Sequence, residues 1–229
     1  SLEPKGIGTD QCESMRSYIY RLADSHRISP SQLLNEILWD RIKKRQHLKY
    51  PKNRRGIWNN SWLLSTGIRT DNLVEVLANT TGISALMACT MQPIKNILNT
   101  RTLVSMTDRY CPECINQHGN AYDAYGRLLW SVGSINACPI HGIRLVQQTC
   151  GAESGKRLEF FRRKWLPGAC MSCGSIAFQC SAQARQNATE VEIWNATQVA
   201  NLISYFPGTP QLFSRESLAS GLSGLIAEY

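Results

Sequence analysis

Pairs of metal-binding side chains separated by two residues restrict the fold of this chain more than any other feature. Cys111 and Cys114 form one such pair, and Cys170 and Cys173 form another. Two intervening residues let both thiolates face one ion while nearby backbone N–H groups point at the sulfurs, as in structural zinc sites. A segment of this kind folds around its ion and needs only a small apolar core.

A third pair with the same spacing supplies the remaining ligands of one site. His141 follows Cys138 by three positions, so an imidazole takes the place of the second thiolate. Together with Cys111 and Cys114, this pair predicts a tetrahedral Cys3His zinc site. Four strong ligands close the coordination shell, whereas a catalytic zinc keeps one position open for water. We therefore expect a structural Zn²⁺ ion.

A second zinc site is predicted from the cysteines that follow. Cys150, Cys170 and Cys173 supply three ligands. The candidates for the fourth ligand are Cys180, Glu153, His118 and water. Cys180 is the preferred candidate, because residues 175–179 can form a short strand that returns the chain to the pair.

Disulfide bridges are the alternative use of so many cysteines. They are favoured by secretion and by an even number, but this chain has nine cysteines and no signal sequence. Its apolar runs are also shorter than the ~20 residues that span a bilayer. We expect a soluble cytoplasmic protein, in which Cys12 and Cys89 are buried as small hydrophobic side chains.

Apolar residues at helical spacing predict an amphipathic helix from Met15 to Leu22. A second helix is predicted to begin with Ser29 as its cap, Pro30 in the first position and Gln32 in a capping box. The apolar face of this second helix comprises Leu33, Leu34, Ile37, Leu38 and Ile42.

A helix-turn-helix outline is predicted further along the N-terminal half. Asp71 is expected to cap one helix, residues 80–83 to form a turn, and Ser84 to begin the second helix. This pattern has low specificity, because two packed helices joined by a glycine turn occur in many helical domains. Residues 85–89 also lack the Arg, Asn or Gln side chains that read bases.

Most of the formal net charge of +8 lies in the N-terminal half and is densest between positions 41 and 55. Such a run suits a polyanion, because each cation that meets a phosphate releases a counterion; a solvated surface is the alternative. The predicted nucleic-acid-binding residues are Arg41, Lys43, Lys44, Arg45, Lys49, Lys52, Arg54 and Arg55. A second basic cluster follows at positions 156–164.

These patterns predict a mainly α-helical chain with small β elements in zinc ribbons. We expect a helical domain at residues 1–108, a zinc-ribbon region at 109–182 and a helical C-terminal segment at 183–229. Apolar residues between the ligands, above all Trp130, are expected to pack around the ion. The C-terminal segment is expected to form one helix through Val191 to Ile203 and another through Leu218 to Ile226, and to dock on the ribbon or on a second copy of the chain.

The ordered motifs of the cysteine region resemble the TniQ family of transposon target-selection proteins. The resemblance rests on Cys111-Pro112-Glu113-Cys114, Trp130, residues 137–145, Cys150 and residues 170–174. The N-terminal half is similar more loosely, at residues 13–23 and 77–84. Family members commonly have a further cysteine after the position of Cys150, where this chain has Gly151-Ala152-Glu153. Many also continue into another helical domain.

The resemblance implies a helix-turn-helix domain followed by two zinc-ribbon elements. It also implies a non-catalytic adaptor in DNA transposition, linking target DNA or a Cascade-type CRISPR effector with guide RNA to the AAA+ ATPase TnsC and the transposase. A homodimer is a further expectation. The alternative is a stand-alone helix-turn-helix transcriptional regulator. An enzyme is not expected, because Asp108, Glu113 and Asp123, the acids nearest the cysteines, form no recognisable metal-binding set.

Overall fold

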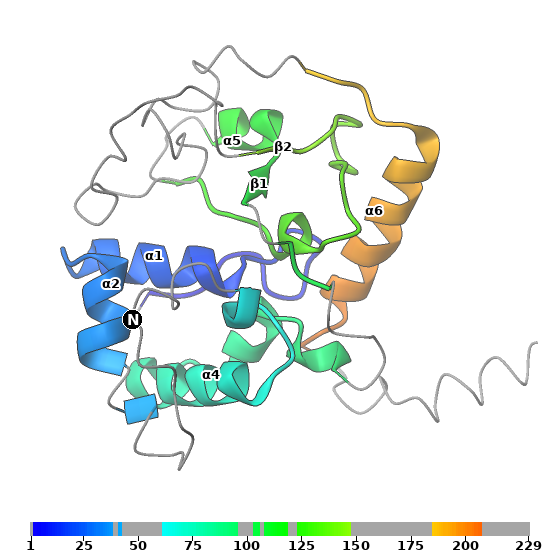
Figure 1. Ribbon diagram of the computed structural model, residues 1–229. Helices are drawn as coiled ribbons and strands as arrows, with labels where there is room; N and C mark the ends of the chain where they lie inside the picture. Colours follow the sequence, from blue (N-terminus) through cyan, green and yellow to red (C-terminus); the bar gives the residue numbers. More distant parts are fainter. Residues whose placement is uncertain are drawn as a thin grey trace, which may run out of the picture.

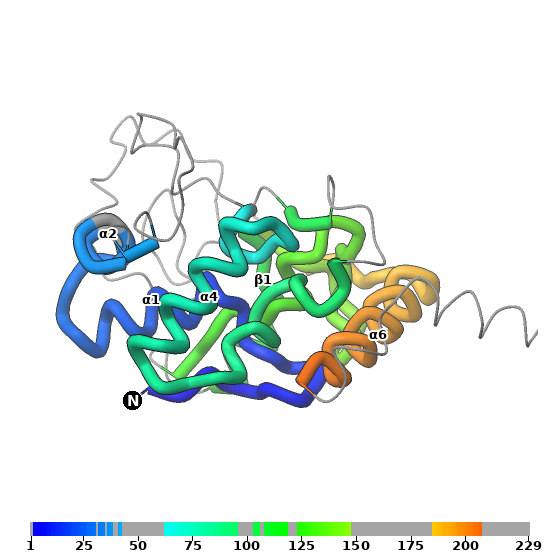
Figure 2. Tube along the Cα trace, turned by 90° about the horizontal axis from the view of Figure 1, so that it is seen from below, coloured from blue at the N-terminus to red at the C-terminus, as the bar shows by residue number. Residues whose placement is uncertain are grey.

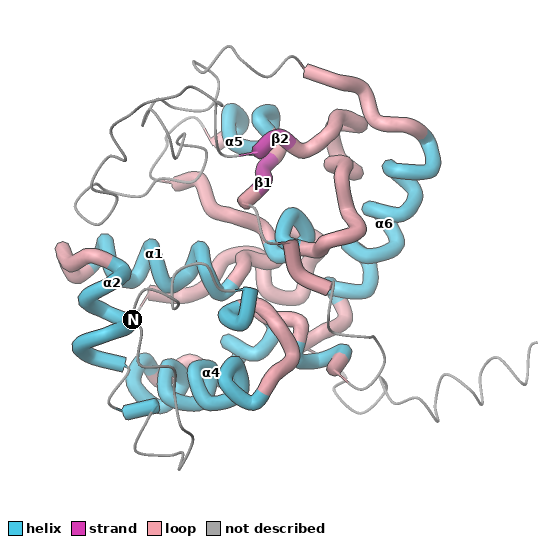
Figure 3. The backbone as a smooth tube through the Cα atoms, viewed as in Figure 1, coloured by secondary structure: helices cyan, strands magenta, loops and turns pink. Residues whose placement is uncertain are grey.

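The computed structural model describes residues 2–38, 41–42, 61–95, 103–105, 108–118, 123–147 and 185–207. In this part of the chain the protein is mainly helical, with one small antiparallel sheet (Figures 1 and 3). The α-helices are α1 Met15–Ser25, α2 Pro30–Gln32, α4 Ile68–Thr81, α5 Pro112–Gln117 and α6 Glu190–Ser204. The strands are β1 Arg109–Tyr110 and β2 Val146–Gln147, and 3₁₀ turns lie at Ser61–Leu63, Ser84–Cys89, Gln92–Ile94 and Leu128–Ser131.

Both N-terminal helices are present, and the second begins at its predicted cap. The Ser14 side chain caps α1, whose apolar residues from Met15 to Leu22 are buried. At α2, Ser29 accepts a hydrogen bond from the Gln32 backbone N–H, and the Gln32 side chain accepts one from the Ser29 backbone N–H. The predicted capping box is therefore confirmed, and it fixes the start of the second helix.

The continuation of α2 differs from the prediction in its winding. Residues Leu33–Leu38 form a π-helix. The wider turn of a π-helix changes which residues share a face. Leu33 and Leu38 are buried, whereas Ile37, predicted on the apolar face, is 43 % exposed. The other predicted members of that face, Leu34 and Ile42, are buried.

Helix α4 begins before its predicted cap. Gly67 holds the N-cap position, and Asp71 lies inside the first turn. There the carboxylate of Asp71 faces the positive end of the helix dipole. At the other end Gly82 adopts a left-handed conformation with φ +78°, which closes the helix and favours glycine. The turn therefore begins later than the predicted residues 80–83, because Thr80 and Thr81 still belong to α4.

The segment after this turn is a 3₁₀ helix, Ser84–Cys89, and not the expected α-helix. It ends where Thr90 becomes extended and its hydroxyl donates to the Met87 carbonyl. Its last residues contact the N-terminal segment, because the Cys12 thiol lies 3.5 Å from the Ala88 carbonyl oxygen. Cys12 and Cys89 are both buried, as predicted for small hydrophobic side chains.

Buried apolar residues from Cys12 to Phe206 form one continuous cluster. In Figure 1, α1, α2 and α4 occupy one half of the molecule, α5 and the two strands the other, and α6 follows one side. Figure 2, turned by 90°, also shows α6 at the edge. The predicted division into 1–108, 109–182 and 183–229 stays a prediction. Within the described residues no helix is long and apolar enough to cross a membrane.

Helix α6 is the first of the two helices predicted at the C-terminal end. Thr189 and Glu192 form its capping box. The residues that it buries are Ala196, Ala200 and Ile203, whereas Val191 and Trp194 are 68 % and 62 % exposed. The second predicted helix, at 218–226, lies outside the described residues.

Candidate metal centre

Two short segments bring the four predicted ligands of the first site together. Cys111 precedes α5 and Cys114 lies in its first turn, while Cys138 and His141 lie at a turn that begins after Ala137. Pro112 starts α5 at a position where no backbone donor is needed. The side-chain ligand atoms of these four residues all lie within 4.8 Å of one another.

The distances between the ligand atoms match a tetrahedral site. His141 Nδ1 lies 3.5 Å from Cys111 Sγ, 3.3 Å from Cys114 Sγ and 3.6 Å from Cys138 Sγ. The sulfurs of Cys114 and Cys138 are 3.6 Å apart. Ligands at about 2.3 Å (sulfur) and about 2.0–2.1 Å (nitrogen) from one ion would be roughly 3.5 Å apart. The residues therefore fit a metal ion, and they place Nδ1 of the imidazole toward it.

The site is closed from solvent on its sulfur side. Cys111, Cys114 and Cys138 are fully buried, and His141 is partly buried. Three thiolates and an imidazole form a soft ligand set, of the kind that selects Zn²⁺ over Mg²⁺ or Ca²⁺. With four protein ligands in place, no coordination position is left for a substrate. The arrangement can stabilise a fold and is unsuited to hydrolysis.

The three thiols influence one another's ionisation. Hydrogen bonds from Cys111 and Cys114 lower the pKa of Cys138, and hydrogen bonding within the cluster, with burial, raises the pKa of Cys114. The Cys138 thiol therefore ionises more readily than an ordinary thiol, and the Cys114 thiol less readily. A divalent cation removes this conflict, because it stabilises all three thiolates and releases their protons.

The turn that carries Cys138 and His141 is fixed by backbone hydrogen bonds. The Cys138 N–H donates to the Ile143 carbonyl at 2.8 Å, and the Gly142 N–H donates to the Cys138 carbonyl at 2.9 Å. Gly142 has a φ of +63°, which L side chains rarely adopt. Just beyond it, Tyr110 on β1 pairs with Val146 on β2. This pairing joins the two ligand segments.

The start of α6 is attached to the same turn. The Arg144 N–H donates to the Gln186 carbonyl, the Ala188 N–H donates to the Gly142 carbonyl, and both distances are 2.9 Å. The Arg144 guanidinium also forms an ion pair with Glu192 at 3.1 Å. Of the two expectations for the C-terminal segment, docking on the ribbon or on a second copy of the chain, these contacts attach its helix to the turn that carries Cys138 and His141.

The apolar residues predicted to pack around the ion do form part of the core. Trp130 is 2 % exposed, and Leu128, Leu129 and Val132 are also buried. The Arg127 guanidinium lies over the Trp130 ring at 5.4 Å from its centroid. Packing is therefore the confirmed role of these residues.

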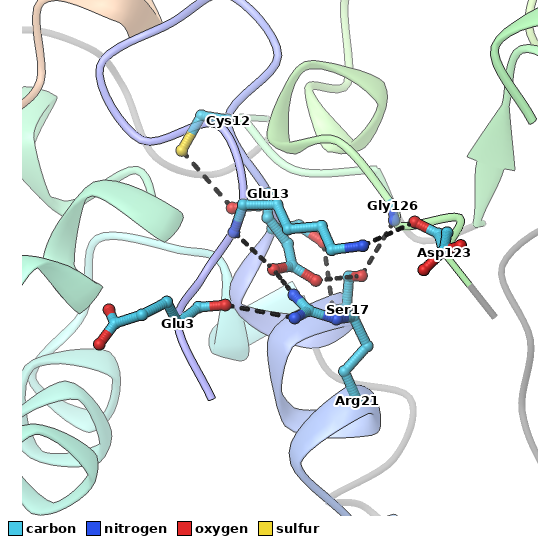
Figure 4. Close-up of polar contacts among 9 residues, drawn as sticks. Glu3, Cys12, Glu13, Ser17, Arg21, Asp123 and Gly126 are labelled. Carbon is cyan, nitrogen blue, oxygen red and sulfur yellow. Dashed lines mark hydrogen bonds and ion pairs between the residues drawn. The ribbon is translucent and has the colours of Figure 1, made fainter. Parts of the chain in front are cut away.

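A buried ionic network connects α1 to the chain just before Leu128, and the motif analysis did not predict it (Figure 4). The Glu13 carboxylate is fully buried, forms an ion pair with Arg21, and accepts hydrogen bonds from the Ser17 hydroxyl at 2.7 Å and the Lys5 N–H at 3.0 Å. The Ser17 hydroxyl in turn accepts from the Gly126 N–H at 2.9 Å. Burial raises the pKa of Glu13 despite the attraction of Arg21.

Backbone contacts extend the same connection. The Ser14 N–H donates to the Gly126 carbonyl and the Leu128 N–H donates to the Cys12 carbonyl, both at 2.8 Å. The Lys5 ammonium donates to the Asp123 carbonyl, also at 2.8 Å. The sequence gives no signal for this network, because Glu13 stands among polar residues such as Gln11, Ser14 and Arg16.

Of the predicted nucleic-acid-binding residues, the structure describes Arg41. Arg41 is exposed, and its guanidinium donates to the Thr80 hydroxyl at 3.1 Å, next to the turn that ends α4. The remaining residues, Lys43, Lys44, Arg45, Lys49, Lys52, Arg54 and Arg55, lie outside the described residues, as do the ligands predicted for a second zinc site, Cys150, Cys170, Cys173 and Cys180.

The acids near the cysteines are engaged in structural contacts. Asp108 forms an ion pair with Arg16, and Glu113 forms one with Arg185. The backbone carbonyl of Asp123 accepts the hydrogen bond from the Lys5 ammonium. His118, an alternative ligand for the second site, lies at the end of α5 with its ring 5.3 Å from that of Tyr125. Burial lowers the pKa of His118, as do the nearby cations Arg127 and Lys5.

Comparison with protein families gives one assignment. The family model described as TniQ matches residues 4–145, which is more than half of the chain and includes all four ligands of the metal centre. No curated protein matches the chain.

Proposed function

The chain belongs to the TniQ family, and from this premise we propose that it is a target-selection adaptor in DNA transposition. Family membership implies a transposition-associated function and a non-catalytic accessory role. The proposal adds that the chain links target DNA, or a Cascade-type CRISPR effector with its guide RNA, to the AAA+ ATPase TnsC and through it to the transposase.

The metal centre is the observation that carries this proposal. Its four protein ligands leave no open position, so the ion, proposed to be Zn²⁺, supplies folding energy and no chemistry. Cys111, Cys114, Cys138 and His141 would hold it. Such a centre is suited to presenting a rigid surface, which is what an adaptor needs. The second zinc ion, bound through Cys150, Cys170, Cys173 and Cys180, is part of the same proposal.

Contact with DNA is proposed for the basic run. Its described member, Arg41, is exposed and bonded to Thr80 at the end of α4. The run therefore starts beside the helix and turn that resemble the first half of a helix-turn-helix. The residues after this turn form a 3₁₀ helix without base-reading side chains. We therefore propose that the basic run contacts the phosphates of the DNA backbone and does not read the bases. Contact of this kind favours the adaptor over the alternative, a sequence-specific regulator.

A salt titration tests the DNA contact. The affinity of the chain for duplex DNA should fall steeply with salt, and the slope should decrease by about one for each phosphate contact removed in a variant with Lys43, Lys44 and Arg45 changed to Gln. Arg185→Gln, which removes an exposed cation paired with Glu113, is the control and should leave the slope unchanged. A salt-independent affinity would contradict DNA contact.

Reconstitution tests the adaptor role. The purified chain should form a complex with TnsC in the presence of ATP and target DNA, detected by size-exclusion chromatography. Cys138→Ser, which removes one ligand, should lose the complex, whereas Cys89→Ser, which changes a cysteine outside the metal centre, should keep it if the variant remains folded. Failure of the wild-type chain to associate with TnsC, with DNA and with a Cascade-type effector would overturn the proposal.

A further inference from the structure

The two nitrogens of the His141 ring have different partners. Nδ1 faces the three sulfurs at 3.3–3.6 Å, whereas Nε2 lies 2.8 Å from the amide nitrogen, Nε2, of Gln117. Gln117 is the last residue of α5 and follows Cys114 by one helical turn. The helix that carries one thiolate therefore also supplies the outer contact of the imidazole.

The identity of the ligand nitrogen determines where the ring carries its proton. An imidazole that binds a metal through Nδ1 keeps its proton on Nε2, so Nε2 becomes a hydrogen-bond donor. Only an acceptor can then face it at 2.8 Å. The Gln117 amide has a carbonyl oxygen at one side and an NH₂ group at the other, and rotation by 180° exchanges them.

We propose that Gln117 is a positioning residue of the metal centre, and this inference rests on the metal centre described above. In the metal-bound protein, Gln117 Oε1 accepts the hydrogen bond from Nε2–H of His141 and so holds the ring with Nδ1 toward the sulfurs. In the metal-free protein, the opposite orientation of the amide donates to Nε2. Gln117 supports the ring in both states because its amide offers both a donor and an acceptor.

The chemistry of the amide leads to a specific prediction for the acidic variant. A glutamate at position 117 can accept from Nε2–H but cannot donate to an unprotonated Nε2 at neutral pH. It should therefore support the metal-bound ring and not the metal-free ring. Carboxylate partners of metal-bound histidines also raise the basicity of the imidazole. Gln117→Glu should bind the ion at least as tightly as the wild type.

Competition with a chromophoric chelator for Zn²⁺ measures the effect in the full chain. Loss of an outer partner typically weakens metal binding about 10–100-fold, and for this exposed amide we expect Gln117→Ala to weaken it about tenfold. Gln147→Ala removes an exposed glutamine of β2 and should leave the affinity unchanged. Circular dichroism at saturating Zn²⁺ checks that each variant is folded.

The outcomes separate this inference from the metal centre itself. A wild-type chain that binds no Zn²⁺ overturns both. A wild-type chain that binds Zn²⁺ while Gln117→Ala stays within about twofold of it overturns only the role of Gln117, as does a Gln117→Glu variant as weak as Gln117→Ala. Nitrogen NMR of the loaded protein tests the premise of this inference: it requires a proton on Nε2 of His141, and a proton on Nδ1 refutes it.

Discussion

Glu13 is a single buried carboxylate that several distant parts of the chain depend on. It contacts Lys5, Ser17 and Arg21, and Ser17 continues the contact to Gly126. Removing one partner of a buried ion pair leaves an uncompensated charge, which typically costs about 3–5 kcal/mol. We expect Glu13→Ala to lower the free energy of unfolding by about 3 kcal/mol, measured by urea denaturation. Glu36→Ala, a change of an exposed glutamate, is the control.

The pH dependence of this contribution has a definite sign. Burial raises the pKa of Glu13 above its ordinary value of 4.5, so the folded state favours the protonated form. The stabilisation from this proton is complete below about pH 4.5 and is lost as the pH rises through the raised pKa. The stability of the wild type relative to Glu13→Gln should therefore fall as the pH rises above about 4.5, measured at saturating Zn²⁺. A relative stability that increases over this range would contradict the assignment.

The metal ligands could be predicted from the sequence, whereas the buried network of Glu13 could not, because only the ligands form pairs with a recognisable local spacing. Cys111 with Cys114, and Cys138 with His141, are pairs within four residues, so the chemistry of each pair is visible locally. The partners of the Glu13 side chain lie within eight residues of it, but Ser17 contacts Gly126, 109 residues away, and no local pattern encodes this long-range contact. Gln117 was missed because an exposed glutamine has no distinctive spacing.

At the scale of elements, the start of α2 was predicted better than the helix faces. Its capping residue Ser29 acts on backbone groups in its own turn, so the sequence indicates this start directly, whereas α4 begins before its predicted cap, Asp71. The face of a helix depends on its winding and on its neighbours. For this reason Ile37, which lies within the π-helix, and Val191, on the outer side of α6, are exposed. Similarly, the segment Ser84–Cys89 is a 3₁₀ helix, and its Ala88 carbonyl contacts the distant Cys12 thiol, a contact that local sequence does not indicate.

Helix α6 provides a paired test of which face holds it in place. Ile203 is 1 % exposed and Val191 is 68 % exposed on the same helix. Truncation of a buried isoleucine typically costs about 2–5 kcal/mol. We expect Ile203→Ala to destabilise the protein by about 3 kcal/mol and Val191→Ala by less than about 0.5 kcal/mol, in thermal or urea unfolding. Equal effects of the two variants would show that α6 docks through a different face.

For the whole molecule, the metal centre and α6 should lose protection together. Gly142 and Arg144, which directly follow the turn at Cys138–His141, are bonded to residues 186–188, immediately before α6. Removal of Zn²⁺ with a strong chelator should therefore increase amide hydrogen exchange first in residues 109–147 and in α6, since ion binding and folding are coupled in such segments. Helices α1 and α4 should keep more of their protection. An unchanged exchange pattern after verified metal removal would contradict this coupling.

The hydrogen bonds between residues 142–144 and 186–188 also have a consequence for chain length. These hydrogen bonds hold two segments side by side that are far apart in the sequence. The cost of closing a loop rises by only about 0.6 kcal/mol for each doubling of loop length. An insertion between residues 147 and 185 should therefore cost little stability as long as these hydrogen bonds form, and a single peptide-bond cleavage in that interval should leave α6 attached through them.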